Sequence, residues 1–373
     1  MTSKSEHNSM FLPRPSLQRL LDALRGAGYR CVGPRVKDNA VLYLPISSAD
    51  ELPSGVEVDQ APGQYRVRES SPSPRQFAWA NGPQALKPLL FAPRETIWRA
   101  TRTAEGGLSF AEAAVQSEAI ALIGARACDL AALALQDKHF LHGEFPDPYY
   151  AQRRERLFIV AVNCSHPAAT CFCASTGDGP RASSGFDLAL SELDEGFVIE
   201  AGSARGQPIL DSLGLGPASA GQVEQALAES ERAAAMQTRS LPSHNLRDAL
   251  FMNLDHPRWA EVADRCLSCG NCTSVCPTCF CHVENAAPAL SGTESEQVRE
   301  WDSCFTRGHS HIHGYTVRPD TRTRYRQWLT HKLGSWHDQF GRSGCVGCGR
   351  CISWCPVGID ITEEASAVCG DDA

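Results

Sequence analysis

Apolar residues near the start of the chain recur at helical spacing, at Leu17, Leu20, Leu21 and Leu24. This spacing predicts an amphipathic helix over residues 16–25, with Ser16 as its N-cap. Residues 41–46 have the composition of a strand. Residues 53–93 contain many prolines and glycines, which predicts short strands and loops rather than long regular elements.

Two continuous apolar runs, at 119–124 and 157–164, enclose a segment with helical character that opens at Asp129. We expect Asp129 to cap this helix and the two apolar runs to be parallel strands joined by it. Parallel sheets place their sites in the loops after the strands. Here those loops carry Cys128 and Cys164.

The remaining pattern divides the chain into three parts. FDLALSEL and FVIEAG, at 186–193 and 197–202, predict a hairpin. A segment rich in Ala, Gly and Ser predicts a linker with one helix over 222–236. From 246 to 355 the pattern is helical, with SEQVREW and RTRYRQWLTHKLGSW as the clearest cases.

The expected fold class is α+β: an N-terminal mixed α/β domain followed by an α-helical ferredoxin-type domain. The expected parts are residues 1–202, a linker at 203–245, and residues 246–373.

Composition places the chain among ordinary globular proteins. It has 373 residues, 42% hydrophobic residues, 21% charged residues and a formal net charge of -8. An acidic balance gives no support for nucleic-acid binding, which leaves a basic footprint. No apolar run is long enough to span a membrane, and the first residues lack the apolar core of a secretory signal. We therefore expect a cytoplasmic protein.

Seventeen cysteines change this picture, because tight clusters of cysteine in a reducing compartment indicate metal or redox sites. Two runs share the spacing C-x2-C-x2-C-x3-C-P of bacterial ferredoxins: Cys266, Cys269, Cys272, Cys276, and Cys345, Cys348, Cys351, Cys355. In two-cluster ferredoxins the fourth cysteine of each run ligates the other cluster. The expected ligands of two [4Fe–4S] clusters are thus Cys266, Cys269, Cys272 with Cys355, and Cys345, Cys348, Cys351 with Cys276.

Other interpretations of these runs fit less well. Structural zinc takes about four ligands, usually as two separated pairs. A radical-SAM motif can be drawn through Cys272, Cys276 and Cys279, but it leaves the second run unexplained. Inert packing suits only the isolated Cys31 and Cys369. A zinc-binding scaffold without redox work stays open as an alternative of another class, which metal content would test.

Four further cysteines concentrate in two short windows of the N-terminal half: Cys128, Cys164, Cys171 and Cys173. Their expected convergence at one edge of the sheet favours a third [4Fe–4S] cluster over zinc or apolar packing. Arg126 beside them would offset part of the cluster charge, or be solvated.

Three sets of residues remain without a firm role. We expect Cys279, Cys281 and Cys304 to lie around the clusters and tune them without binding iron, although they could ligate something further. A basic stretch over 322–332 would offset cluster charge, dock an acidic partner, or form a solvated helix face. The histidines of HSHIHG, at 309, 311 and 313, are expected in a polar surface loop.

These motifs resemble a known family. GARACDL, NC…CFC…GDGP, ELPSGVEVDQAPGQYRVR, CLSCGNCTSVCPTCFC and HKLG…CVGCGRCISWCPVGIDI are together similar to the iron–sulfur beta subunit of cytoplasmic NAD(P)-linked [NiFe] hydrogenases, or sulfhydrogenases. They are also similar to an iron–sulfur subunit of anaerobic sulfite reductase. The resemblance covers roughly residues 15–362 and is most specific in the cysteine segments.

The resemblance implies an electron-transfer subunit that is not catalytic alone. Its expected partners are a flavin subunit that binds NAD(P)H and the small and large subunits of a [NiFe] hydrogenase, or sulfite reductase subunits in the alternative. The sequence agrees with this division of labour, because it contains no nickel-type cysteine pairs and no convincing flavin or nicotinamide fingerprint.

Overall fold

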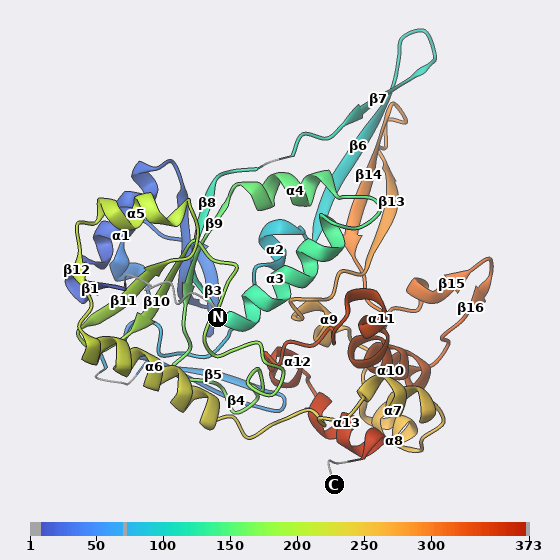
Figure 1. The fold of residues 1–373 in the computed structure, drawn as a ribbon. Coiled ribbons are helices and arrows are strands. Elements are labelled where there is room, and N and C mark those ends of the chain that lie inside the picture. Colours follow the sequence, from blue (N-terminus) through green and yellow to red (C-terminus); the bar gives the residue numbers. More distant parts are fainter. Residues whose placement is uncertain (1–8, 70–72, 116, 371–373) are drawn as a thin grey trace.

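The computed structural model describes residues 9–69, 73–115 and 117–370, and its largest element is an eight-stranded sheet (Figure 1). In spatial order the strands are β12 (Gly216–Pro217), β1 (Met10–Pro13), β11 (Gly196–Ala201), β10 (Leu188–Glu192), β9 (Leu157–Val162), β8 (Ile120–Ala125), β2 (Arg30–Lys37) and β3 (Ala40–Pro45). The four strands β10, β9, β8 and β2 run parallel, and the pairs outside them are antiparallel.

Both faces of this sheet are covered, which explains the continuous apolar runs in its central strands. Alternate side chains of β9 belong to two different cores: Phe158, Val160 and Val162 to one, Leu157, Ile159 and Ala161 to the other. Helices α1 (Leu17–Gly26) and α5 (Gly206–Ser212) contribute to the first core. Helices α3 (Ala127–Phe140) and α4 (Pro148–Glu155) contribute to the second.

The predicted crossover, hairpin and helices in this half are confirmed. β8, α3 and β9 form the parallel crossover, β10 and β11 form the hairpin, and α6 (Ala220–Ala235) is the helix expected in the linker. The expected cap of α3 is wrong, because the helix begins at Ala127 with Arg126 as the N-cap. Asp129 lies inside the first turn, and its carboxylate accepts a hydrogen bond of 3.2 Å from the Arg126 amide.

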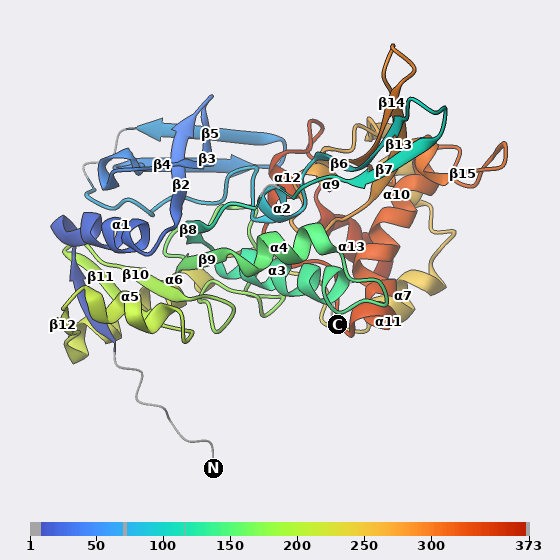
Figure 2. The same ribbon diagram turned by 90° about the horizontal axis from the view of Figure 1, so that it is seen from above.

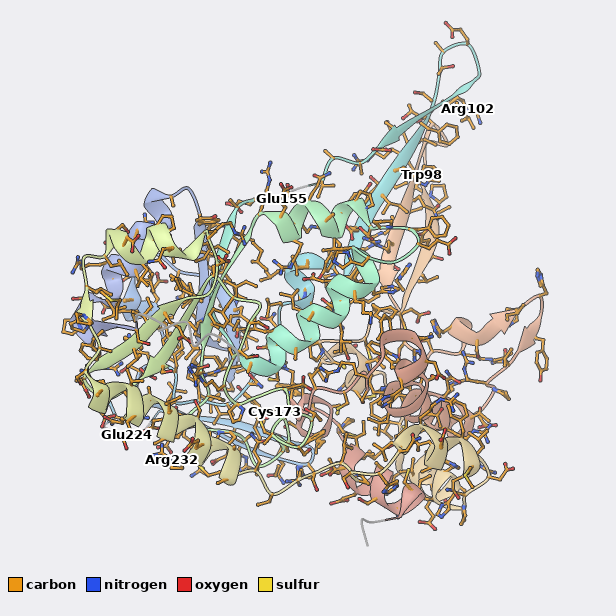
Figure 3. All side chains as sticks on the ribbon, viewed as in Figure 1. Trp98, Arg102, Glu155, Cys173, Glu224 and Arg232 are labelled. Atoms are coloured by element: carbon orange, nitrogen blue, oxygen red, sulfur yellow. The ribbon has the colours of Figure 1, made fainter. Side chains whose placement is uncertain are left out.

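The helical prediction for 295–301 is also wrong. This segment belongs to β14 (Glu294–Trp301), which lies between β13 (His282–Pro288) and β6 (Arg94–Arg102) in a four-stranded sheet completed by β7 (Leu108–Glu112). All three pairings are antiparallel. This sheet projects from the body of the molecule, with Trp98 and Arg102 on its outer part (Figure 3). Pairing with a distant strand outweighs the weak helical preference of Glu, Gln and Arg.

The carboxyl-terminal helices pack around an aromatic core that includes Trp259, Tyr325 and Trp328. They are α7 (Leu246–Met252), α8 (Arg258–Arg265), α9 (Asn271–Ser274), α10 (Thr321–Thr330), a π-helical turn (His331–Ser335), α11 (Trp336–Phe340), α12 (Arg350–Ser353) and α13 (Ile361–Cys369). The predicted helix over 322–336 is therefore confirmed. These helices gather at the end of the molecule opposite to β12 and α1 (Figure 2). The described part of the chain also contains two short hairpins, β4 (Val56–Ala61) with β5 (Gln64–Glu69) and β15 (His311–Ile312) with β16 (Tyr315–Thr316), and the short helix α2 (Lys87–Leu90). Three single-turn 3-10 helices are at Arg14–Ser16, Ala49–Glu51 and Gly308–Ser310.

The hairpin β4–β5 docks its tip on the second cysteine run. The Gly63 amide donates to the Ile352 carbonyl at 3.1 Å, and a Cβ at Gly63 would lie 3.0 Å from the Cys355 carbonyl oxygen. Gln60 accepts a hydrogen bond of 2.7 Å from Ser353.

None of the helices in the described part of the chain combines the length and apolar character needed to cross a membrane.

Candidate iron–sulfur sites

The two cysteine runs fold in the same way. In each run the residue before the second cysteine and the residue after it have positive φ: Ser268 at 49° and Gly270 at 77°, Gly347 at 63° and Gly349 at 72°. A short helix follows each time and carries the third cysteine, on α9 and α12. This backbone turns the cysteines of each run toward one side of a tight loop.

The four cysteines expected to bind the first cluster line one cavity: Cys266, Cys269, Cys272 and Cys355. Phe305, Tyr325 and Trp328 form part of its wall, and Cys351 of the second set also borders it. Amides point at two of the sulfurs, because Ser268 donates to Cys266 at 3.4 Å and Ile359 to Cys355 at 3.3 Å. Such donors stabilise negative charge on a cysteine sulfur.

The second expected set also comes together. Burial raises the pKa of Cys345 to about 12, and the charges of Cys348 and Cys276 contribute. Burial likewise raises the pKa of Cys351 well above its usual value, with Cys345, Cys348 and Cys276 acting on it. The fourth cysteine of the first run is thus close enough to all three of these cysteines for its charge to act on each of them, which is compatible with the crossed pattern. Buried thiols that resist ionisation on their own suit a site in which bound iron stabilises the thiolates.

The third set consists of Cys128, at the start of α3, and of Cys164, Cys171 and Cys173, in the loop after β9. Burial raises the pKa of Cys171 well above its usual value, and the charges of Cys173 and Cys164 add to this effect. Burial has the same effect on the pKa of Cys128, which Cys173 also influences. Two amide groups donate to these sulfurs at 3.4 Å: Asn81 to Cys128 and Gln237 to Cys173. Cys173 lies in the interior, between the sheet and the carboxyl-terminal helices (Figure 3).

The second and third sets are direct neighbours. The Cys171 thiol lies 3.9 Å from the Cys348 carbonyl oxygen, and the charge of Cys348 acts on both Cys128 and Cys173. The contact is tight, because a Cβ at Gly347 would lie 2.5 Å from the Cys173 amide nitrogen. The three sets thus follow one another, with the second set in the middle.

Buried charged residues accompany these sets, and the sequence had not suggested the first of them. Arg350, within the second run, is 1% exposed and forms an ion pair of 2.8 Å with Asp129. Arg126, which the sequence had suggested, is buried and donates to the Phe77 and Trp79 carbonyls at 2.8 and 3.0 Å, which excludes the solvated alternative. In the basic stretch, Lys332 is buried and donates to Thr278 Oγ1 at 2.8 Å, so a solvated helix face does not describe it.

The histidines of HSHIHG separate into two kinds. His311 and His313 are exposed around the hairpin β15–β16, as predicted for a polar surface loop. His309 is half-buried, and its Nδ1 lies 3.1 Å from the Asp302 carboxylate. A hydrogen bond to the Cys281 thiol raises the pKa of His309 above its usual value.

Within the described residues, no group of three or more His, Cys, Asp or Glu side chains surrounds a single-ion position. In a [4Fe–4S] cluster each of the four cysteines binds a different iron, so the sulfurs surround a volume rather than a point. The donor set fits that kind of group: soft thiolates, few carboxylates, and a cavity with aromatic walls.

Comparison with known proteins agrees with this chemistry. The model of a family described as "4Fe-4S dicluster domain" matches residues 265–359, the segment that contains both runs. With the buried thiols and their donors, this defines the chain as an iron–sulfur subunit that transfers electrons.

A relative makes the assignment more specific. Sulfhydrogenase 2 subunit beta of Pyrococcus furiosus is 35% identical over 260 residues, which cover 66% of this chain and 73% of that protein. The chain belongs to the family of sulfhydrogenase beta subunits. No solved structure matches it.

Proposed function

We propose that the chain relays electrons through three [4Fe–4S] clusters between a flavin subunit that binds NAD(P)H and a [NiFe] hydrogenase module. The proposed ligands are the crossed ferredoxin sets together with Cys128, Cys164, Cys171 and Cys173. The observation that carries the proposal is the serial contact of the sets. Cys351 borders the first cavity, and the Cys348 carbonyl lies 3.9 Å from the Cys171 thiol of the third set. Bound clusters of this type accept and release single electrons.

The surrounding residues would hold such centres at workable potentials. Arg350 and Lys332 place buried positive charge beside the second set, which favours the reduced, more negative state. Asn81 and Gln237 do the same for the third set through hydrogen bonds to sulfur. Phe305, Tyr325 and Trp328 keep water from one side of the first set, while Cys269 is exposed and gives that set access to a partner surface.

The hydrogenase partner is favoured over a sulfite or sulfur reductase partner because the relative is named a sulfhydrogenase subunit. All seventeen cysteines are free thiols in the structure, which fits the reducing cytoplasm that we propose as its compartment.

Reduction by two donors tests the proposal. The chain would be produced anaerobically together with the subunits encoded beside it, and the complex examined by electron paramagnetic resonance. We expect both NAD(P)H and hydrogen to reduce its clusters. In Cys348→Ser, electrons should no longer pass between the side that NAD(P)H reduces and the side that hydrogen reduces. Oxidation of the NAD(P)H-reduced clusters by sulfite, with no reduction by hydrogen, would exclude the hydrogenase partner.

A further inference from the structure

The tetrapeptide Thr-Cys-Phe-Cys occurs twice in the chain, at 170–173 and 278–281. In both copies the threonine is fully buried and anchored to the second cysteine run. Thr170 Oγ1 lies 2.8 Å from Ser353 Oγ, and Thr278 Oγ1 donates to the Gly344 carbonyl at 2.7 Å. The first copy supplies two cysteines of the third set. The second copy therefore presents two cysteines from an equivalent position beside the same run.

Those two cysteines face a common space. Cys279 and Cys281 line one cavity with Lys87 and Asp302, whereas Phe280 between them packs elsewhere, on His139 and Trp336. The ring centroids of Phe280 and His139 are 3.7 Å apart. The aromatic anchor thus fixes the segment and directs both thiols to the opposite side.

The strand pairing of β13 with β14 brings a third thiol to this place. His282 pairs with Trp301, and the Asp302 amide donates to the Cys281 carbonyl at 2.9 Å. Cys304 follows two residues after Asp302. This places Cys304 in the turn that follows the contact with Cys281, where the Thr306 amide donates to the Ser303 carbonyl at 2.9 Å, and the Cys304 thiol is half-buried.

A histidine completes the group. His309 lies beside Cys281, because its Nδ1 contacts the Asp302 carboxylate at 3.1 Å and the Asp302 amide donates to the Cys281 carbonyl. A carboxylate on one ring nitrogen orients a metal-binding histidine and leaves the other nitrogen to bind. Here Nε2 is the nitrogen left for that role.

Two buried lysines indicate that negative charge belongs here. Lys87 and Lys332 are 5% and 4% exposed, and within the described residues neither has a carboxylate in ion-pair contact. Lys87 Nζ donates to the Thr273 and Ser274 carbonyls and lies 3.8 Å from the centre of the Trp301 ring. After burial, the charges of Cys279 and Cys276 have the largest influence on the pKa of both lysines. Iron-bound thiolates would provide the charge that buried ammonium groups require.

We propose that Cys279, Cys281, Cys304 and His309 bind a fourth iron–sulfur cluster of the [4Fe–4S] type. The site adjoins two others, because Cys269 of the first set lines the same cavity as Cys279 and Cys281, and Cys276 of the second set stands three residues before Cys279 in the chain. It therefore forms a branch beside the main series. One electron leaves a reduced neighbouring cluster, which is oxidised, and reduces this one; no bond is made or broken. A histidine ligand raises its potential above that of an all-cysteine cluster.

Metal content tests the proposal on the full chain purified without oxygen. We expect Cys304→Ser to lose about four iron atoms and four sulfides per chain, and the control Cys369→Ser, a half-buried thiol away from the sets, to lose none. The spectra of the other clusters should persist. Iron content and spectrum equal to those of Cys369→Ser would overturn the proposal, as would one zinc in place of the lost iron.

A second variant distinguishes the loss of a ligand from misfolding of the protein. His309→Cys should keep the full iron content and lower the potential of one cluster, because thiolate replaces imidazole. An unchanged set of potentials would contradict His309 as a ligand. Failure of the three-cluster proposal is distinguishable, because it would be seen as unchanged iron in Cys171→Ser, a variant outside this site.

Discussion

Arg350 and Asp129 form an ion pair with 2.8 Å between Nη1 and Oδ1, and both side chains are shielded from solvent. Arg350 stands between two cysteines of the second run, and Asp129 follows Cys128 on α3. The guanidinium also donates to the Gly82 and Gln84 carbonyls at 2.9 and 3.1 Å. One side chain thus joins the second cysteine set, the third set and the loop before α2.

Replacing this arginine should have both an electrostatic and a structural effect. In Arg350→Met the Asp129 carboxylate stays buried without its partner, which costs about 3–5 kcal/mol. The loss of a positive charge should also lower the potentials of the neighbouring clusters. A redox titration followed by electron paramagnetic resonance measures the shift, and the temperature of cluster loss measures the stability.

The matched control is Arg322→Met, because Arg322 is exposed on α10. It should leave both quantities unchanged. Equal potentials in the two variants would contradict the electrostatic role of Arg350.

Gly349 should not tolerate a side chain. A Cβ there would lie 2.3 Å from the Thr170 carbonyl oxygen, and its φ of 72° is unfavourable for other residues. We expect Gly349→Ala to separate the second run from residues 170–173 and to lower iron content. Gly221→Ala, with nothing within 4 Å of the added Cβ on helix α6, should be neutral or stabilising by about 0.5–1 kcal/mol. Normal iron content in Gly349→Ala would show that this close contact is dispensable.

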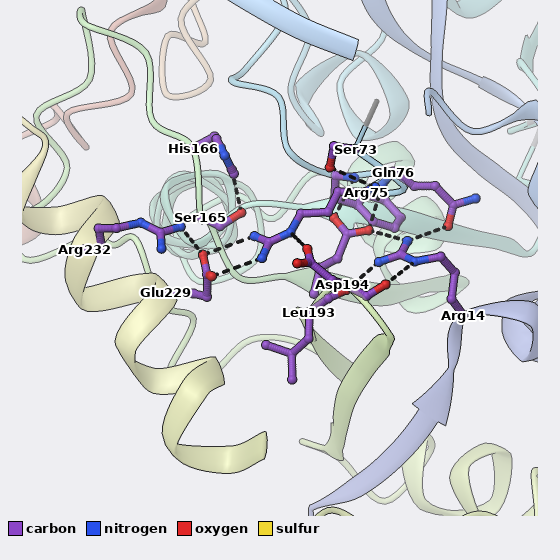
Figure 4. A network of polar contacts seen from close by, with 12 residues as sticks. Arg14, Ser73, Arg75, Gln76, Ser165, His166, Leu193, Asp194, Glu229 and Arg232 are labelled. Atoms are coloured by element: carbon purple, nitrogen blue, oxygen red, sulfur yellow. Dashed lines mark hydrogen bonds and ion pairs between the residues drawn. The ribbon is translucent and has the colours of Figure 1, made fainter. Parts of the chain in front are cut away.

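Acid should weaken the link between α6 and the β10–β11 turn, where Arg75 binds two carboxylates (Figure 4). Its Nε donates to Asp194 at 2.7 Å, and its two terminal nitrogens donate to Glu229 at 3.1 and 3.2 Å. The hydrogen bond from Arg75 lowers the pKa of Asp194. Burial alone would raise the pKa of Glu229, but the bonds and charges of Arg75 and Arg232 lower it.

The sign of the pH dependence follows. Both folded pKa values lie below the unfolded ones of about 3.9 and 4.3, so this stabilisation is present above about pH 4 and is lost as the pH falls through the folded values. Thermal unfolding between pH 6 and 3 should show a shallower acid dependence in Arg75→Gln than in the control Arg66→Gln, an exposed residue on β5. Identical slopes would contradict this role of Arg75.

Replacing single cysteine ligands should show which cluster each of them binds. Cys348→Ser should destroy the second cluster and stop electron passage, because that set lies between the other two. Cys171→Ser should cost only the third cluster. Iron analysis and spectra of reduced protein distinguish these results; intact transfer with unchanged iron in Cys348→Ser would count against the ligand assignment.

The sequence predicted features that depend on local spacing. The two ferredoxin runs are recognisable because a cluster needs cysteines at short, fixed intervals. The crossover around α3 is recognisable because strands buried on both faces are apolar throughout. Cys128 and Cys173 could be grouped because they concentrate in an otherwise cysteine-poor region.

Features that depend on distant contacts were not predictable. Residues 295–301 became β14 because they pair with β6, about two hundred residues away along the chain. Arg350 looks like an ordinary solvated charge in sequence, and Lys332 belongs to a basic stretch with three open interpretations. Only the fold shows that both are buried beside thiols. In sequence His309 resembles its exposed neighbours, and only the fold places Asp302 and Cys281 beside it.

The most direct measurement is the content of iron, acid-labile sulfide and zinc in anaerobically purified protein, with electron paramagnetic resonance after dithionite reduction. The account predicts equal iron and sulfide, about twelve of each for the three serial clusters and about sixteen with the fourth, no zinc, and signals broadened by neighbouring spins. About eight irons, unchanged in Cys128→Ser, would contradict the third cluster and with it the relay through the N-terminal half.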